Sequence, residues 1–332
     1  MYRSVSVGIL SLALLVCGCK SNPEEEAELP PEVIAPLPAG ATNFSGDTAY
    51  NYVKKQVEFG PRVPGTPAQK ATANWLQEKL LQSCDTVYRQ DVTVKAGDGT
   101  TTLPCYNLIG VINPAATRRY LLLAHWDTRP WADEDTQNKD KPIDGADDGA
   151  SGVAVLLEIA RQLKVNSLPA NLGVDILFVD VEDWGKNEWG DSSYGLGTQY
   201  WAQNPHVPGY AAVGGILLDM VGAKDARFPL ESTSTQAAGP LQQDVWKAAG
   251  EAGFSSYFLY EQGNGITDDH TFINSLTRIP TIDIIHLQRN SMSVFPAHWH
   301  THNDNLSVID PATLEAVGKT VLQFLRRKGI SA

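Results

Sequence analysis

Carboxylate and imidazole side chains gather in a few short motifs along this 332-residue chain. Three of its seven histidines lie in the segment SVFPAHWHTHNDN, residues 293–305, and acids crowd the motifs HWD (125–127), DGADDGASG (144–152) and FVDVED (178–183). Carboxylates and imidazoles without thiolates form a ligand set that suits zinc. Three protein ligands with one open position would mark a catalytic zinc rather than a structural one.

These side chains follow apolar runs that read as strands. His125 and Asp127 follow YLLLA, Glu182 and Asp183 end DILFVDV, and Asp219 ends GGILLD. Further along, Asp268 precedes a helical turn, Asp283 lies in TIDII, and His300 lies in the loop after it. An acid at a strand end is usually a turn or cap residue when taken singly. Because ligands in open α/β sheets bind beyond the carboxyl ends of the strands, the whole set predicts one site.

The elements that must position this site alternate between strand and helix. Strand-like runs of four to eight apolar residues are separated by amphipathic stretches such as 149–164 and 310–328, the latter with Asp310 as its expected N-cap. This pattern predicts an α/β fold: a mostly parallel, mixed central sheet with helices on both faces, in three layers. The first two strands precede the alternation, so we expect them to form an antiparallel edge.

The amino-terminal region predicts export. Residues 1–18 contain Arg3 and the apolar run Val7–Val16, which is typical of a signal peptide and too short to span a membrane. The sequence VCGC resembles a bacterial lipobox, so we expect Cys19 to be lipidated. Residues 19–41 then form a Pro/Glu-rich tether and residues 42–332 a single catalytic domain. This predicts an exported bacterial lipoprotein, held at the membrane by its lipid and facing the periplasm or cell surface.

The net charge and the positions of the cysteines limit the partners and ligands that the protein can have. The formal net charge of −12 argues against nucleic acid as a partner. Cys84 and Cys105 each border a strand-like run, so a disulfide between them is plausible in an exported protein. They lack the spacing of metal ligands.

Several motifs together carry a resemblance to a known family. HWD, GADDGASGVAVLLE, FVDVED, LLDMVGA, DDH and HWHT follow in order the pattern of the secreted zinc aminopeptidase clan. Within that clan, LLDMVGAKDARFP, TDDHTF and VFPAHWHT resemble the glutaminyl cyclases (glutaminyl-peptide cyclotransferases) of the bacterial branch, over roughly residues 45–328.

The resemblance implies a role for each matching residue. It implies one zinc ion per chain, with the ligands Asp148, Asp183 and His300. It implies Glu182 as the general base and acid, Asp219 as the partner of the substrate α-amine, and Asp268 in a hydrogen-bond network near the leaving group. It also implies that Trp189, Phe295 and Trp299 line the pocket. His298 and His302, which flank the expected ligand, are then supporting or surface residues.

Two positions depart from the animal cyclases. Asp183 stands where those enzymes have Glu, so the metal distance or the backbone must adjust. Asp283 stands where they have His. If Asp268 and Asp283 lie close together, one of them holds a proton.

Two activities therefore remain open. The first is zinc-dependent cyclisation of the N-terminal glutamine of peptides or proteins to pyroglutamate, with release of ammonia. The second is a dinuclear zinc aminopeptidase, whose second metal would use His125 and Asp219 beside a bridging Asp148, with Asp127 orienting His125. The Phe295–Trp299 wall favours the cyclase. A non-catalytic binding lipoprotein is a third reading, which the complete ligand set disfavours.

Overall fold

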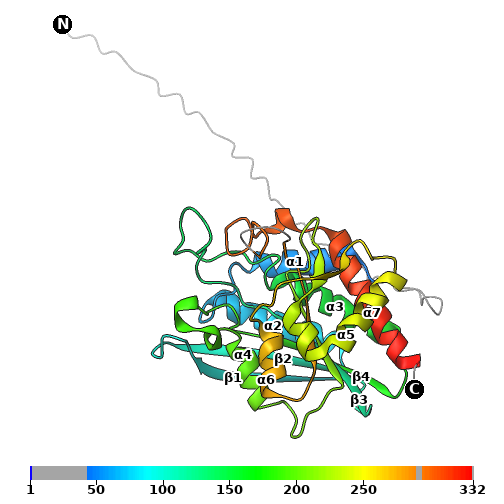
Figure 1. Cartoon of the computed structure of the whole chain (residues 1–332). Helices are drawn as coiled ribbons and strands as arrows, with labels where there is room; N and C mark the ends of the chain where they lie inside the picture. The colour runs from blue at the N-terminus through cyan, green and yellow to red at the C-terminus, as the bar shows by residue number, and fades with distance from the viewer. Residues whose placement is uncertain (2–42, 289–293, 331–332) are drawn as a thin grey trace. The chain divides into compact units, whose positions relative to one another are not determined.

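A six-stranded sheet forms the centre of the protein (Figure 1). The computed structural model describes Met1 and residues 43–288 and 294–330. The sheet has the strand order β1-β2-β4-β3-β5-β8. Its strands are β1 (Thr86–Lys95), β2 (Thr102–Ile112), β3 (Arg118–His125), β4 (Leu172–Val179), β5 (Gly214–Asp219) and β8 (Thr281–Ile285). A short parallel pair, β6 (Phe228–Leu230) with β7 (Phe258–Gln262), forms a second sheet, which the sequence pattern did not predict.

The strand directions confirm the predicted mixed, mostly parallel sheet. β1 pairs with β2 and β2 with β4 in antiparallel fashion, whereas β3 is parallel to both β4 and β5, and β5 is parallel to β8. The two strands that precede the alternation therefore form the antiparallel edge, as expected. The chain passes from β4 across β3 to β5, and such a switch in direction opens a crevice at the carboxyl ends of the strands.

Helices cover both faces of the sheet. The helices are α1 (Gly46–Glu58), α2 (Pro67–Ser83), α3 (Ala150–Val165), α4 (Leu196–Gln203), α5 (Ser232–Glu251), α6 (Asp269–Leu276) and α7 (Pro311–Ile330). Alternate residues of a strand point to opposite faces. Accordingly, Leu122 and Ala124 join the core under α1, α3, α5 and α7, and Leu121 and Leu123 join the core under α4 and α6. In Figure 1, α4 and α6 lie side by side over their face.

Helix α5 begins earlier than the sequence indicates. The pattern favours a helix starting at Pro240, but the helix begins at Ser232, because the Glu231 side chain accepts hydrogen bonds from the backbone N–H groups of Thr233 and Ser234. The backbone departs from helical geometry at Ala238, just before Pro240. A proline interrupts the helical hydrogen-bond ladder, which explains the kink there.

The plausible disulfide is not present. Cys84 and Cys105 are both free and buried. Cys84 follows α2 and packs against Gly110 of β2, whereas Cys105 lies five residues earlier on that strand and faces Asn107 and the carbonyl of Asp180. At about 3.3 Å per residue, this separation along β2 is too long for a disulfide to span.

The predicted signal peptide beyond Met1, Cys19 and the whole of the tether lie outside the described residues. Over residues 43–288 and 294–330, none of the helices is long and apolar enough to cross a bilayer.

Candidate metal and catalytic site

Strained backbone marks the carboxyl edge of the sheet. Val181, Met220 and His300 have φ angles of 56°, 47° and 54°. Such positive φ values are unfavourable for side chains larger than glycine, above all for β-branched valine. The three residues lie directly before Glu182, directly after Asp219, and at the expected zinc ligand itself. Strain of this kind persists where surrounding structure fixes it, and it clusters at functional sites.

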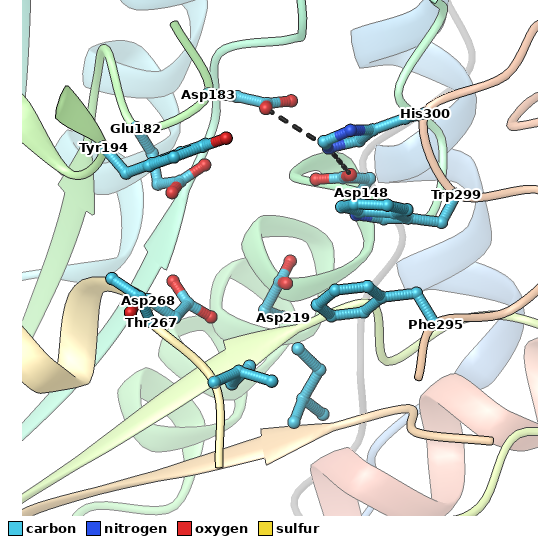
Figure 2. A pocket seen from close by; sticks show the side chains of 12 residues that line it. Asp148, Glu182, Asp183, Tyr194, Asp219, Thr267, Asp268, Phe295, Trp299 and His300 are labelled. Carbon is cyan, nitrogen blue, oxygen red and sulfur yellow. Dashed lines mark ion pairs between the residues drawn. The ribbon is translucent and has the colours of Figure 1, made fainter. Parts of the chain in front are cut away.

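Asp148, Asp183 and His300 come together at this edge, as the sequence predicted (Figure 2). Nε2 of His300 lies 3.4 Å from Oδ1 of Asp183 and 3.7 Å from Oδ2 of Asp148. All three side chains are buried, and Oδ2 of Asp183 has no hydrogen-bond partner among the described residues. Ligand atoms around a tetrahedral zinc are about 3.3 Å apart, so the donor set and its spacing fit this metal.

Arg129 links two of these ligands. It donates to both carboxylate oxygens of Asp133, at 2.7 and 2.6 Å, and to Oδ1 of Asp183, at 2.9 Å. Asp133 in turn lies 3.3 Å from Nδ1 of His300. A carboxylate on the far nitrogen of a histidine fixes its orientation toward a metal. The sequence reasoning missed Arg129 and Asp133 because the segment RPWADED has the composition of an ordinary polar loop.

Hydrogen bonds from two buried side chains fix the loop that carries Asp148. The buried guanidinium of Arg62 donates to the backbone carbonyls of Trp126, Asp144 and Gly145. The second side chain, Asp304, accepts hydrogen bonds from the N–H groups of Asp147 and Asp148.

Gly149 is required beside this loop. Its φ is 93°, and a Cβ there would lie 2.8 Å from the carbonyl of Asp127 and 3.0 Å from the ring of His125. No larger residue fits this close approach.

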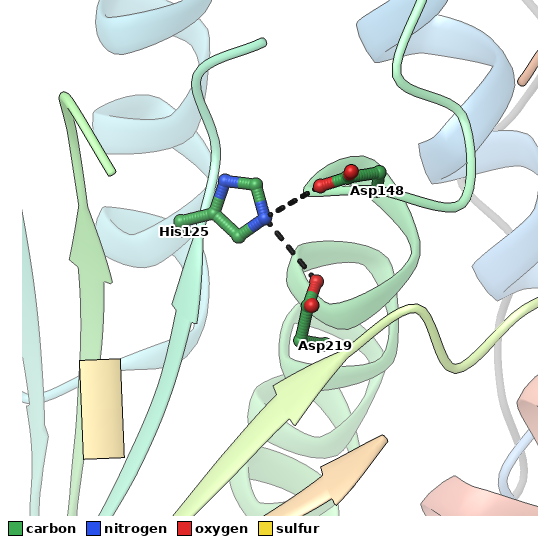
Figure 3. A group of neighbouring side chains, drawn as sticks. All are labelled: His125, Asp148 and Asp219. Atoms are coloured by element: carbon green, nitrogen blue, oxygen red, sulfur yellow. Dashed lines mark hydrogen bonds and ion pairs between the residues drawn. The ribbon is translucent and has the colours of Figure 1, made fainter. Parts of the chain in front are cut away.

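A second buried group shares Asp148 (Figure 3). Nε2 of His125 lies 3.1 Å from Oδ1 of Asp148 and 3.2 Å from Oδ1 of Asp219. Asp127 lies 3.6 Å from Nδ1 of His125, but its hydrogen bonds go to the backbone N–H groups of Glu182 and Asp183, at 3.0 and 3.2 Å. Asp127 therefore also fixes the turn that presents these two acids. These spacings fit a second zinc as well as they fit direct hydrogen bonds.

A pocket opens beside the first metal group (Figure 2). It has a volume of about 60 Å³, room for roughly two waters and hence for a small group rather than a peptide. Its wall comprises Asp148, Glu182, Asp183, Tyr194, Asp219, Ile266, Thr267, Asp268, Ile285, Phe295, Trp299 and His300. In the figure, Glu182, Tyr194 and Asp268 line one side and Phe295 and Trp299 the other, with the metal group above.

The aromatic wall is continuous with the metal group. The rings of Phe295 and Trp299 stack with centroids 4.2 Å apart, and Trp299 stacks on His300 at 3.6 Å. These residues lie where the sequence placed them. Trp189 does not line this pocket; its ring packs edge-on to Trp131 at 6.3 Å. Tyr194, which the sequence did not single out, lines the pocket instead of Trp189.

Burial dominates the proton affinities in the pocket. It raises the pKa of Glu182 well above its usual range, and it raises that of Asp219 to about 6 although His125 opposes the shift. Burial works in the same direction on Asp183, but His300 and Arg129 hold the pKa of Asp183 below its ordinary value. The two adjacent carboxyls therefore differ: their surroundings favour the anionic form of Asp183 and the protonated form of Glu182.

The other clustered histidines lie outside the metal group. Nε2 of His298 lies 2.9 Å from Oδ2 of Asp147. His302 is exposed, with Nδ1 2.8 Å from Oδ2 of Asp135. Neither ring belongs to a described group that could hold a metal.

Comparison with known proteins places the chain in a family. Residues 107–325 match peptidase family M28, and since this is more than half of the chain, the chain belongs to that family. The crystal structure of Bacteroides thetaiotaomicron glutaminyl cyclase bound to N-acetylhistamine superposes with a TM-score of 0.82 at 48% identity, covering 85% of this chain and 98% of that one. Within family M28, this chain groups with the bacterial glutaminyl cyclases.

Two further relatives bear on the metal and the reaction. A Zn-dependent exopeptidase from Parabacteroides distasonis superposes with a TM-score of 0.83 at 46% identity, covering 86% of this chain and 99% of that one. The glutaminyl-peptide cyclotransferase of Gloydius blomhoffii is 29% identical over 296 residues, covering 80% of this chain and 76% of its own. The family, the exopeptidase and the donor set agree on zinc as the metal.

Proposed function

We propose that this protein cyclises the N-terminal glutamine of peptides or proteins to pyroglutamate and releases ammonia. The observation that carries the proposal is a small, aromatic-walled pocket in which Glu182 faces Asp219 and Asp268 beside a complete zinc ligand set. The bacterial and animal cyclotransferases among its relatives support the same activity.

In this proposal, Asp148, Asp183 and His300 hold a single zinc ion. When bound there, zinc supplies a Lewis acid that polarises the γ-carbonyl of the substrate glutamine. The support of Asp183 and His300 by Arg129 and Asp133 keeps both ligands in place before the metal arrives.

Asp219 and Glu182 handle the substrate amine. Asp219 accepts a hydrogen bond from the α-amino group and orients it toward the carbonyl carbon of the γ-amide. Glu182 takes one proton from the amine as its nitrogen bonds to that carbon, and returns the proton to the amide nitrogen as the carbon–nitrogen bond to it breaks. One proton therefore passes through Glu182, ammonia leaves, and no water is consumed.

Asp268 and the aromatic wall complete the pocket. Asp268 accepts a hydrogen bond from the departing amide group. Phe295 and Trp299 orient the glutamine side chain and exclude water, which strengthens the interactions inside. Because both reacting groups belong to one residue, orientation supplies much of what the reaction needs.

A dinuclear aminopeptidase is the second candidate, and the His125–Asp148–Asp219 group favours it. The metal content of the purified protein, together with assays on Gln- and Leu-terminated peptides, separates the two activities. One zinc per chain with ammonia released from the glutamine peptide supports the cyclase. Two metals with release of free amino acids would support the peptidase, and neither activity would support a binding protein.

We further propose that the enzyme is an exported lipoprotein. The apolar run Val7–Val16 and the VCGC sequence support a signal peptide and a lipid on Cys19. The Pro/Glu-rich residues 19–41 would then place a single catalytic domain, from residue 42 on, at a distance from the bilayer. The membrane contact would be the lipid alone, because the tether has little apolar surface to bury.

A further inference from the structure

A pair of buried carboxyl groups lies at the inner end of the catalytic pocket. Asp268 lines the pocket, and Asp283 lies behind it on β8, two residues before the pocket residue Ile285. An oxygen of each, together with a ring nitrogen of His270, lies within 4.8 Å of the other two. Asp283 is fully buried and Asp268 is 5% exposed, so two negative charges this close would repel strongly.

The hydrogen bonds of the pair require a proton. If both groups are carboxylates, neither oxygen of Asp283 and only Oδ1 of Asp268 has a partner. A buried polar oxygen without a partner is costly. One proton between the two groups reduces this deficit from three oxygens to one, because the protonated group donates to the ionised one.

The two groups differ in how well they hold a negative charge. Asp268 is the N-cap of α6, where Oδ1 accepts the backbone N–H of Asp269 at 2.5 Å. A helix amino terminus and a backbone donor both stabilise an anion. Asp283 lies within a parallel sheet, and its carboxyl group receives no hydrogen bond from a described N–H group.

The other charged groups around Asp283 are mostly acidic. From α6, the Nδ1 atom of His270 lies 3.8 Å away, but Nε2 of the same ring faces Glu231 at 3.2 Å. Asp219 on β5 adds a further carboxyl that acts on Asp283. Burial, followed by the charges of Asp268, Asp219 and Glu231, raises the pKa of Asp283 well above its usual range, whereas that of Asp268 rises to about 7.

We propose that Asp283 is a neutral carboxylic acid that donates its proton in a hydrogen bond to Asp268, and thereby positions Asp268 as the ionised acceptor facing the substrate. Asp283 acts through Asp268 and does not touch the substrate, so it is a positioning residue. The inference rests on the proposed function for the role of Asp268, but the location of the proton follows from the geometry of the pair alone.

Substitutions at the two positions distinguish donor from acceptor. Asn at 283 preserves a donor of similar shape, so Asp283→Asn should lower kcat for a glutamine peptide by no more than about tenfold. Leu has a similar volume but cannot donate, so Asp283→Leu should lose more. Asp268→Asn removes the charged acceptor and should lose about 10²–10³-fold. Greater activity in Asp268→Asn than in Asp283→Asn would reverse the assignment and overturn the proposal.

Stability provides a test that does not depend on activity. A group whose pKa is raised by folding contributes most below its unfolded pKa of about 3.9, and that contribution is lost as the pH rises. The melting temperature of Asp283→Asn relative to wild type should therefore increase from pH 4 to pH 8 (about the range over which Asp283 would otherwise ionise). A difference that is constant or falls with pH would show that the pair holds no shared proton, and would overturn the proposal.

The activity assays and the melting curves together separate failure of this inference from failure of the proposed function. If the wild-type protein releases no ammonia, the proposed function fails, and the melting curves still show whether the pair holds a proton. If the wild type is active but Asp283→Asn is as impaired as Asp283→Leu, the positioning role fails alone. Loss of a bound metal from Asp283→Asn, measured beside the wild type, would instead assign Asp268, His270 and Asp283 to a metal and overturn the proposal.

Discussion

Arg129 donates a hydrogen bond of 2.9 Å to Oδ1 of Asp183 and leaves Oδ2 of that carboxylate without a described partner. The guanidinium therefore fixes the orientation of the Asp183 carboxylate, whose Oδ1 also lies 3.4 Å from Nε2 of His300. Two nitrogens of Arg129 also donate hydrogen bonds to Asp133, and Asp133 faces His300. One buried cation thus orients two of the three proposed zinc ligands.

Replacing Arg129 should weaken zinc binding without removing a ligand. Supporting groups of this kind typically contribute about 10–100-fold in metal affinity or activity, so Arg129→Gln should lose activity at limiting zinc and regain much of it at high zinc. Zinc titration of the purified variant measures this. Arg326→Gln, at a position remote from the site on α7, serves as the control. Activity in Arg129→Gln that is lost equally at every zinc concentration would contradict the role.

The three clustered histidines should have separable effects. His300→Ala leaves two protein ligands and should lose both zinc and activity. His298→Ala and His302→Ala should retain the metal, with at most the 10–100-fold effect typical of supporting residues (about the size expected for His298, which contacts Asp147). Metal analysis of the three purified proteins is the measurement. Complete zinc loss from His302→Ala would show that the ligand register is wrong.

Much of this site was predictable from the sequence because its residues follow strand ends. Parallel strands bring their carboxyl ends to one edge, so Asp148, Asp183, Asp219 and His300 could be placed together from short motifs. Arg129 and Tyr194 could not, because they lie in loops whose path depends on tertiary contacts. The early start of α5 escaped prediction for a similar reason, because it is set by the side chain of Glu231, which itself faces His270.

Glu231 should stabilise the fold in a pH-dependent way. Its buried carboxylate accepts backbone hydrogen bonds from Thr233, Ser234 and Ile266 and faces His270. Burial opposes ionisation, but these partners, His270 first, lower its pKa from 4.5 to about 2. A lowered pKa contributes stability above the unfolded pKa, and the contribution is lost as the pH falls toward 2.

Glu231→Gln should therefore be destabilised by up to about 3 kcal/mol at neutral pH, with the gap to wild type closing below pH 4.5 (about where the unfolded group titrates). Urea unfolding of both proteins across this pH range measures the gap. Glu188→Gln, at an exposed position, should show no such trend. A gap that stays constant with pH would mean that packing, not charge, explains the loss.

The lipid anchor gives a prediction at the other end of the chain. If Cys19 carries the lipid, Cys19→Ser should move the protein from the membrane fraction to the soluble fraction of its native host while its activity persists. Cys17→Ser is the matched control and should remain with the membrane. Wild-type protein recovered entirely in the soluble fraction would rule out the anchor, since the tether has little apolar surface to replace it.

The sharpest prediction concerns two adjacent acids. Asp127 holds the backbone N–H groups of both Glu182 and Asp183, yet Asp183 faces His300 and Glu182 faces the pocket. Glu182→Gln is nearly isosteric and should keep the zinc and the fold. Because Gln cannot carry a proton, its cyclisation rate should fall by about 10²–10⁴-fold.

Asp183→Asn should behave differently, because a neutral amide is a poor zinc ligand and the variant should lose metal as well as rate. The comparison is made on the two purified proteins side by side, by zinc content and by ammonia release from a glutamine peptide. Zinc lost from Glu182→Gln but kept in Asp183→Asn would reverse the two roles. Near-normal cyclisation by Glu182→Gln would remove the proton-transfer mechanism proposed for Glu182.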